Sequence, residues 1–534
     1  MLTALVAAAA AAVVLTVLLG GSDHARRIVR EAVRLERRVQ PKVLRLQPTQ
    51  KLHKVSAGLI RRVKEQGHDE HRSRTRAAAR SSVFVSSSTT PPTAVRSLKA
   101  SPRAGDFARF DDVWFKGGAL DYVAEPYVAQ NGGRILETWN WGAALSSDGG
   151  RTFTFADPYT DFPKAHGGFC CDQLAYYVPG LDLWIWVLQY VPDESGNILR
   201  LAVARGSAAF DTARSNRTTF TLFDISPTQF GWPADAEFDF NGISSTKSSL
   251  FISTNVINGN RYEGLILRLP LAALARGVLP AREMSYYKTL VGGVPRLVQG
   301  ADTTMYFASH RNASTLTVWS WPDGTLSVSQ TDVPHDAYNL HRPFHCRRSA
   351  GPSSDDWCEG LRDDAFKNDD SILTGWVAKG RVGFAWNAGQ DRQRQLPYPY
   401  VMAVELDQGT LRLADETLIW SPRYAYQYPA IAPNARGDLG GVVLRGGGRS
   451  FESCTAVIRD AASARSPSGW QAYTLTASNR GFRSYTGDYL GAAPAGARSN
   501  AWAASCMDLR GGANPLKHLR VHWLSFGRAR DGPP

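Results

Sequence analysis

The feature of this 534-residue chain that most limits its fold is a repeat of short β-type runs, which begins near residue 105. Each unit opens with a polar residue, continues with apolar or small residues, and passes through a turn into a second apolar run. The opening positions recur about every 60 residues and are Glu125, Asp172, Asp239, Asp302, Asp370, Tyr428 and Asp488. Between them the sequence shows no long run with the 3.6-residue period of a helix.

A repeat of this length made of β-runs predicts a β-propeller, in which each unit forms one four-stranded sheet, or blade. We therefore expect an all-β domain over residues 105–534, a single propeller with seven blades. Six blades follow if the first or the fourth unit is misread, and a pair of β-sandwiches is the main rival. The strand-like run at 111–122 would add an outer strand to the last blade and close the ring.

The first 21 residues carry no charged side chain and are long enough, as an apolar helix, to cross a bilayer. They predict either a signal peptide or an uncleaved membrane anchor. Residues 22–104 follow with 20 Lys and Arg against 6 Asp and Glu, a net charge of +14. Apolar residues in 24–39 have helical spacing, which indicates a basic amphipathic helix suited to an anionic membrane, or a solvated linker. Residues 81–104 are rich in Ser, Thr and Pro and predict a flexible spacer.

The charge of the body differs from that of the arm. Because the whole chain carries +13, the remaining residues carry 13 − 14 = −1. Such a nearly neutral body lacks the basic surface of a nucleic-acid binder, so we expect no nucleic-acid partner. The Arg-rich arm favours a cytoplasmic location, whereas glycosylation sequons at Asn216 and Asn312 and an even number of cysteines favour export. We expect a membrane-anchored or secreted protein with an extracytoplasmic body.

The six cysteines are enough for three disulfides and are Cys170, Cys171, Cys346, Cys358, Cys454 and Cys506. The third and fourth are close enough to close a short loop, and the last two lie in successive units of the repeat. The first two are adjacent, and a vicinal disulfide there would lie directly before Asp172, where local strain tends to accompany function. The plainer interpretation is that each of these two pairs elsewhere or stays buried as a thiol.

A turn in the first unit has a known pattern, S-x-D-x-G-x-T-[WF], carried by Ser146, Asp148, Gly150, Thr152 and Phe153. Its Ser and Asp side chains would bond turn backbone groups, its glycine would supply a left-handed conformation, and its aromatic ring would pack into the blade. The turn resembles the Asp-box of sialidase-like β-propellers, where it is structural and lies on the outer rim.

The resemblance also implies a chemistry that can be compared with this sequence. Sialidases of that family bind the substrate carboxylate with three arginines and use a Tyr/Glu nucleophile pair with an Asp acid/base. The first arginine lies in a Phe-Arg-Ile-Pro-like segment of the first blade, and residues 121–135 contain no such segment. The departure argues against sialidase activity proper.

The polar residues that open the units are the candidate site, because the first strand of each blade would bring them to one face of the channel. Neighbouring carboxylates cannot all ionise without cations or hydrogen-bond donors. They indicate a site for a carbohydrate or another polyhydroxylated ligand, with Ca²⁺ as a candidate cation. One alternative is a glycoside hydrolase with a carboxylate pair at the channel mouth. The other is a protein-interaction scaffold whose carboxylates only cap backbone N–H groups. No nucleotide-binding or dinucleotide-binding motif suggests a further cofactor.

Overall fold

The computed structural model describes part of the chain, including the whole ring of blades. The described residues are 27–34, 39–46, 106–116 and 124–533, apart from 195, 211–217, 260, 290–293, 339–370, 392, 448–449, 467, 480–488 and 511–518. The apolar segment 1–21 and the spacer 81–104 lie outside them. Among the described residues no helix is long and apolar enough to cross a membrane.

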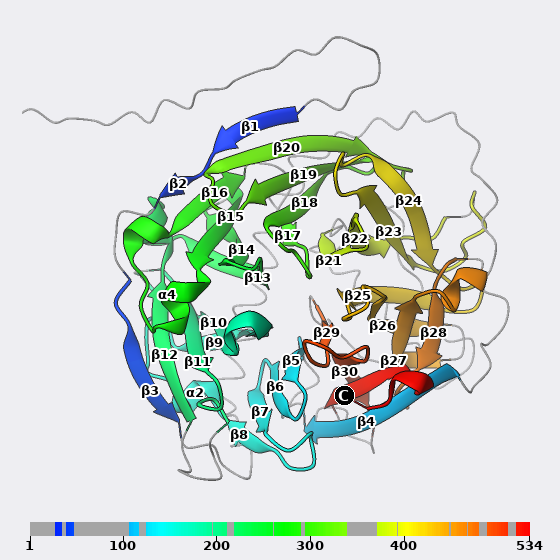
Figure 1. The fold of residues 1–534 in the computed structure, drawn as a ribbon, viewed down its shortest axis with the longest axis horizontal. Coiled ribbons are helices and arrows are strands. Elements are labelled where there is room, and N and C mark those ends of the chain that lie inside the picture. Colours follow the sequence, from blue (N-terminus) through cyan, green and yellow to red (C-terminus); the bar gives the residue numbers. More distant parts are fainter. Residues whose placement is uncertain are drawn as a thin grey trace, which may run out of the picture.

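Seven antiparallel sheets surround a central channel, which confirms the seven-bladed propeller (Figure 1). The first blade consists of β5 (Tyr127–Asn131), β6 (Arg134–Trp139), β7 (Gly142–Ser146) and β8 (Thr154–Ala156). The second consists of β9 (Phe169–Val178), β10 (Leu183–Tyr190), β11 (Leu199–Arg205) and β12 (Thr218–Ile225). The third consists of β13 (Glu237–Ser245), β14 (Ser249–Asn258), β15 (Arg261–Pro270) and β16 (Ser285–Thr289).

The remaining four blades follow in chain order. The fourth consists of β17 (Arg296–Leu297), β18 (Thr304–Asn312), β19 (Thr315–Pro322) and β20 (Ser327–Pro334), and the fifth of β21 (Ile372–Ala378), β22 (Arg381–Ala388), β23 (Tyr400–Asp407) and β24 (Leu413–Ile419). The sixth consists of β25 (Ala425–Pro433), β26 (Leu439–Gly447), β27 (Ser450–Arg459) and β28 (Gln471–Thr474). The seventh contains β29 (Gly491–Pro494), β30 (Trp502–Leu509) and β31 (Leu519–Arg528). Short helices lie between strands: α2 (Pro158–Asp161), η2 (Pro179–Leu181), η3 (Pro227–Phe230), α4 (Leu271–Ala275), η4 (Ala281–Glu283), η6 (Ser463–Arg465) and η8 (Ala529–Asp531).

The ring closes through a strand from the N-terminal side of the domain. Strand β4 (Phe107–Lys116) pairs antiparallel with β31 and is the outer strand of the seventh blade. The sequence predicted this closure from the run at 111–122. Closing a ring of sheets in this way joins the two ends of the domain by a full ladder of backbone hydrogen bonds.

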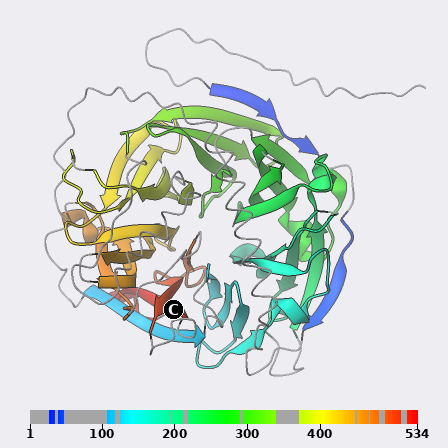
Figure 2. The same ribbon diagram turned by 180° about the vertical axis from the view of Figure 1, so that it is seen from behind.

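The basic arm contributes three more strands, β1 (Arg27–Glu31), β2 (Val33–Arg34) and β3 (Lys42–Leu46). They pair with β20, β16 and β12, so blades four, three and two each gain a fifth strand on the outer rim (Figure 2). Of the two interpretations of 24–39, the amphipathic helix is wrong for residues 27–34, which form strands. The outer strands of three blades offer unpaired N–H and C=O groups, and the arm satisfies them as strands.

The predicted Asp-box forms the hairpin between β7 and β8. Thr152 donates from its backbone N and its hydroxyl to the Asp148 carboxylate, at 2.9 and 2.6 Å. The Gly150 N–H donates to Ser146 Oγ at 3.0 Å, and Gly150 has a φ of +82°. A Cβ on Gly150 would lie 2.3 Å from the Trp523 ring, so this position requires glycine. Phe153 packs edge-on against Phe115 at 4.9 Å.

Candidate functional site at the channel mouth

The chain enters every blade through its inner strand, so the inner strands begin at one end of the channel, which we call the mouth. Four of the predicted site residues lie there: Glu125 precedes β5, Asp172 and Asp239 lie near the start of β9 and β13, and Tyr428 lies in the first half of β25. All four are at most 7% exposed. Glu125 and Tyr428 have φ values of +42° and +55°, an uncommon conformation for residues with side chains that tends to mark functional positions.

The fourth unit is aligned differently from the sequence prediction, and Asp302 does not belong to the mouth. The inner strand of that blade is β17, and Asp302 follows it in the turn to β18. Its carboxylate lies 2.5 Å from Lys247 Nζ, in the turn that ends the neighbouring inner strand. Asp302 therefore lies at the far end of the channel, because the acidic residue before the second strand was taken for the one before the first. Asp370 and Asp488 lie outside the described residues.

The best-defined polar group at the mouth joins blades two and three. Gln189 Nε2 donates to Asp239 Oδ1 at 3.3 Å, and Asn241 Nδ2 donates to Gln189 Oε1 at 2.7 Å. In the β9–β10 ladder Phe169 pairs with Tyr190 and Gln173 with Leu188, so residues 170–172 lie opposite Gln189 alone. This three-against-one bulge places the backbone of Asp172 opposite Gln189, and the Asp172 carboxylate lies near the Tyr159 hydroxyl. We call Asp172, Gln189, Asp239 and Asn241 the mouth cluster.

A second chain of hydrogen bonds at the mouth links blades one and two. Asn140 Nδ2 donates to Glu125 Oε2 at 2.8 Å. The Tyr159 hydroxyl lies 2.8 Å from the Asn140 carbonyl oxygen and 2.9 Å from the Cys170 carbonyl oxygen, and its proton is shared between them. Burial, with Asp157 and Asp172 nearby, holds the pKa of Tyr159 well above its usual value, so the hydroxyl remains a donor.

Sequence reasoning missed Glu237, the first residue of β13. Burial first, and then the charges of Asp239 and Asp235, raise its pKa to about 7. A half-buried carboxyl that titrates near neutrality is typical of acid–base or binding sites. Glu237 and Asp239 are two positions apart on one strand, a separation of roughly 6.6 Å between their Cα atoms. The signal available in the sequence was this Glu-x-Asp spacing at the start of the third unit.

Two disulfides lie in the described part of the chain. Cys454 and Cys506 join β27 to β30, as their places in successive units suggested. Cys170 and Cys171 bond to each other at the start of β9, so the plainer interpretation of separate partners or thiols is wrong. Cys346 and Cys358 lie outside the described residues.

Residues of the inner strands line a cavity of about 30 Å³, among them Tyr127, Arg296, Gln299, Thr374 and Tyr489. This is room for about one or two water molecules. In the described ranges, no group of three or more His, Cys, Asp or Glu could hold a metal ion.

No protein-family model and no curated protein matches the chain. Among solved structures, the chain is similar to an α-L-arabinofuranosidase of Fusarium graminearum in complex with an iminosugar inhibitor. The two share 10% identity over 79% of this chain and 98% of that chain, with a TM-score of 0.39. A Trypanosoma rangeli sialidase shares 10% identity over 70% of this chain and 59% of that chain, with a TM-score of 0.35. The Neurospora crassa Pan2 WD40 domain shares 11% identity over 79% of this chain and 97% of that chain, also with a TM-score of 0.35.

The fold is a seven-bladed β-propeller, with one turn of the Asp-box pattern in its first blade. The solved structures include carbohydrate-complexed hydrolases and a WD40 domain alike, and at TM-scores below 0.5 they carry no argument about chemistry. The function must be argued from the residues at the mouth.

Proposed function

We propose that this propeller binds a carbohydrate at the channel mouth, with the mouth cluster and Glu125 as its polar contacts. Carboxylate oxygens accept hydrogen bonds from sugar hydroxyls, and side-chain amides both donate to and accept from them. Asp239 accepts from the Gln189 amide, and Glu125 accepts from the Asn140 amide. Acceptors and donors for sugar hydroxyls are therefore both present. Small-molecule sites commonly combine such convergent polar groups with aromatic walls, here supplied by Tyr159.

The observation that carries the proposal is the shared Gln189 amide. It bonds Asp239 and Asn241 of the next blade and faces the bulge that carries Asp172. Blades can pack through apolar side chains alone, as the clusters of buried tryptophans elsewhere in the ring show. A buried carboxylate bonded to a neutral amide, with a second buried carboxylate on the bulge opposite, is a costly way to join blades and a useful way to present acceptors to a ligand.

A glycan array probed with the full chain tests the proposal. We expect binding to specific glycans, reduced about tenfold by Asp239→Asn, which replaces a charged acceptor with a neutral one, and by Gln189→Leu, which removes the amide. Hydrogen bonds to charged groups are worth roughly 1.5 kcal/mol or more, which is about tenfold in affinity. Asp302→Asn is the matched control, since it changes an aspartate at the far end of the channel and should leave binding intact. Folded protein that binds no glycan would overturn the proposal in favour of a protein-interaction scaffold.

Glu237 favours a second candidate, a glycoside hydrolase. Such enzymes pair a protonated carboxyl of raised pKa with an ionised carboxylate about 5–10 Å away. With a pKa of about 7, Glu237 suits the acid, and Asp239 is a second carboxyl two residues along the same strand. Hydrolysis of a panel of aryl glycosides tests this candidate. Turnover that falls by about 10²-fold or more in Glu237→Gln would support it, and glycan binding without turnover would leave binding alone.

The location of the body is also a proposal. We infer that the apolar segment 1–21 places the propeller outside the cytoplasm, either anchored or released, with the basic arm next to an anionic membrane surface. Two disulfides in the described residues support this location, since such bonds persist in oxidising compartments. Protease protection of intact cells or vesicles tests it: a body shielded from external protease would contradict the inference.

A further inference from the structure

The vicinal disulfide occupies the most irregular point of the mouth. Cys170 and Cys171 are the second and third residues of β9, and Asp172 follows directly. Side chains of consecutive strand residues normally point to opposite faces of a sheet. A bond between the two sulfurs prevents that alternation, and the β9–β10 ladder is interrupted there, where residues 170–172 lie opposite Gln189. The disulfide therefore coincides with the bulge that carries Asp172, one of the four residues of the mouth cluster.

The same pair is connected to the other polar chain of the mouth. The Cys170 carbonyl shares the Tyr159 hydroxyl with the Asn140 carbonyl, and Asn140 bonds Glu125. A change in the backbone at Cys170 thus reaches Glu125 through Tyr159 and Asn140, and reaches Asp172 through the intervening Cys171. Both predicted ligand contacts depend on the conformation that the disulfide holds.

The two disulfides of the described residues differ in what they can do. Cys454 and Cys506 are fully buried and enclose a long loop, with a sequence separation of 52. Cys170 is 4% exposed, but Cys171 is only half-buried, and their bond closes no loop beyond the two residues themselves. A bond that constrains so little of the unfolded chain adds little global stability. Its effect is local, and its more exposed sulfur can meet a reductant.

We propose that the Cys170–Cys171 disulfide is a redox-sensitive positioning element of the carbohydrate site, an inference that rests on the proposed function. Oxidised, it holds the bulge that places residues 170–172 opposite Gln189. A thiolate of a dithiol reductant attacks Cys171 Sγ and displaces the Cys170 thiolate, and its second thiol completes the exchange. The disulfide gains two electrons and two protons, the reductant leaves as a cyclic disulfide, and β9 can adopt the regular pleat.

The test uses the full chain on the glycan array in three states: oxidised, treated with limiting dithiothreitol, and reoxidised with oxidised dithiothreitol. Alkylation followed by mass spectrometry identifies the cysteines that were reduced. We expect Cys170 and Cys171 to react first, the array signal to fall about tenfold through the loss of one or two hydrogen bonds, and the signal to return on reoxidation. The unfolding temperature should stay unchanged, which separates positioning from general stability.

Two double variants complete the design. Cys170→Ser with Cys171→Ser should reproduce the reduced state and no longer respond to dithiothreitol, whereas Cys454→Ser with Cys506→Ser should keep the redox response. Equal glycan binding by the oxidised and reduced protein would overturn this inference and leave the proposed function intact. Oxidised protein that binds no glycan would overturn both.

Discussion

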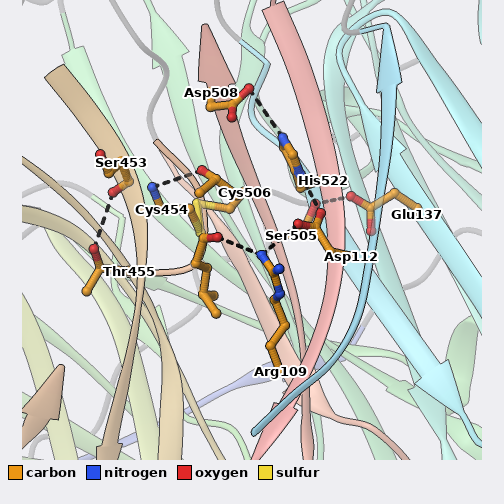
Figure 3. The surroundings of a disulfide bond; sticks show 12 residues. Arg109, Asp112, Glu137, Ser453, Cys454, Thr455, Ser505, Cys506, Asp508 and His522 are labelled. Carbon is orange, nitrogen blue, oxygen red and sulfur yellow. Dashed lines mark hydrogen bonds and ion pairs between the residues drawn. A yellow bond between two sulfur atoms is a disulfide. The ribbon is translucent and has the colours of Figure 1, made fainter. Parts of the chain in front are cut away.

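Two buried polar groups in this propeller are built from similar residues and are balanced in opposite ways. At the closure of the ring, His522 of β31 lies between Asp112 of β4, 2.7 Å away, and Asp508 of β30, 3.3 Å away (Figure 3). We call these three residues the closure seam. There a cation stands between two carboxylates. At the mouth, Asp239 accepts a hydrogen bond from the neutral amide of Gln189, and Glu237 lies two residues away on the same strand.

The pKa values reflect that difference. Burial lowers the pKa of His522, but the bonds to Asp112 and Asp508 outweigh it, and the net pKa is raised. Burial likewise raises the pKa of Asp112, but His522 and Arg109 lower it further. At Glu237, burial and neighbouring carboxylates act in the same direction and raise the pKa to about 7. In the seam, opposite charges offset the effect of burial, whereas at Glu237 neighbouring carboxylates add to it, as in sites that use a raised pKa.

The largest expected effect concerns the two disulfides: Cys454–Cys506 lies next to the closure seam, and Cys170–Cys171 lies at the mouth. Cys454→Ala with Cys506→Ala should lower the free energy of unfolding by about 4 kcal/mol, because the bond closes a loop of about 52 residues. Removing the vicinal pair at the mouth should change it by less than about 1 kcal/mol on the same chain-entropy argument. Urea unfolding of both double variants measures the difference. Equal losses would show that the mouth, too, is built for stability.

The next largest expected effect is the loss of stability when the closure seam is broken. His522→Ala should lower the free energy of unfolding by about 2–3 kcal/mol, because it leaves Asp508, 1% exposed, with the longer 3.5 Å pair to Arg510 in place of the imidazole between two carboxylates. The matched control is His166→Ala, which breaks a more exposed pair with Asp193 and should cost under about 1 kcal/mol. Glycan binding by His522→Ala should stay normal in the folded protein, so a parallel loss of binding would contradict the separation of seam from mouth.

A smaller effect is the pH dependence of stability. Because the folded pKa of His522 is above 6.5, its stabilisation is complete below pH 6.5 and is lost as pH rises through the folded value. Because the folded pKa of Asp112 is below 3.8, its stabilisation is present above that pH and is lost in more acidic solution. The seam therefore stabilises the ring most between about pH 4 and 6.5. Unfolding temperatures measured across this range should show that plateau, and the plateau should vanish in His522→Ala.

The sequence predicted the scaffold better than the site, for physical reasons. A blade is a local unit, so short stretches of sequence are enough to predict its strands, its Asp-box turn and the closing run before Glu125. The mouth depends on register between blades. Asp302 was misplaced because no acidic residue precedes the inner strand of that blade, so the aspartate before its second strand was taken instead. Glu237 was missed because burial and neighbouring carboxylates shift its pKa only after folding. The arm was predicted as a helix or a linker because the open sheet edges with which it pairs cannot be seen in a local pattern.

The smallest expected effect is a pKa shift at Glu237, and it tests whether the mouth carboxylates are structural like those of the closure seam. Asp239→Asn keeps the shape of the side chain and an acceptor for Gln189, but it removes one of the charges that raise the pKa of Glu237. That pKa should move from about 7 toward 4.5, while burial and Asp235 keep it from falling fully. NMR titration of the Glu237 carboxyl measures the shift.

The sign of its effect on stability follows from linkage. A raised folded pKa means that Glu237 favours folding below pH 4.5 and that this contribution is lost as pH rises through about 7. Removing the Asp239 charge reduces that loss, which offsets the weakened bond to Gln189. The free energy of unfolding of Asp239→Asn at pH 8 should therefore stay within about 1 kcal/mol of the wild-type value. Asp112→Asn, the same change in the seam, should be clearly destabilising at pH 6, where His522 is charged. If the two variants lose equal stability, the mouth carboxylates are structural and the proposed site is wrong.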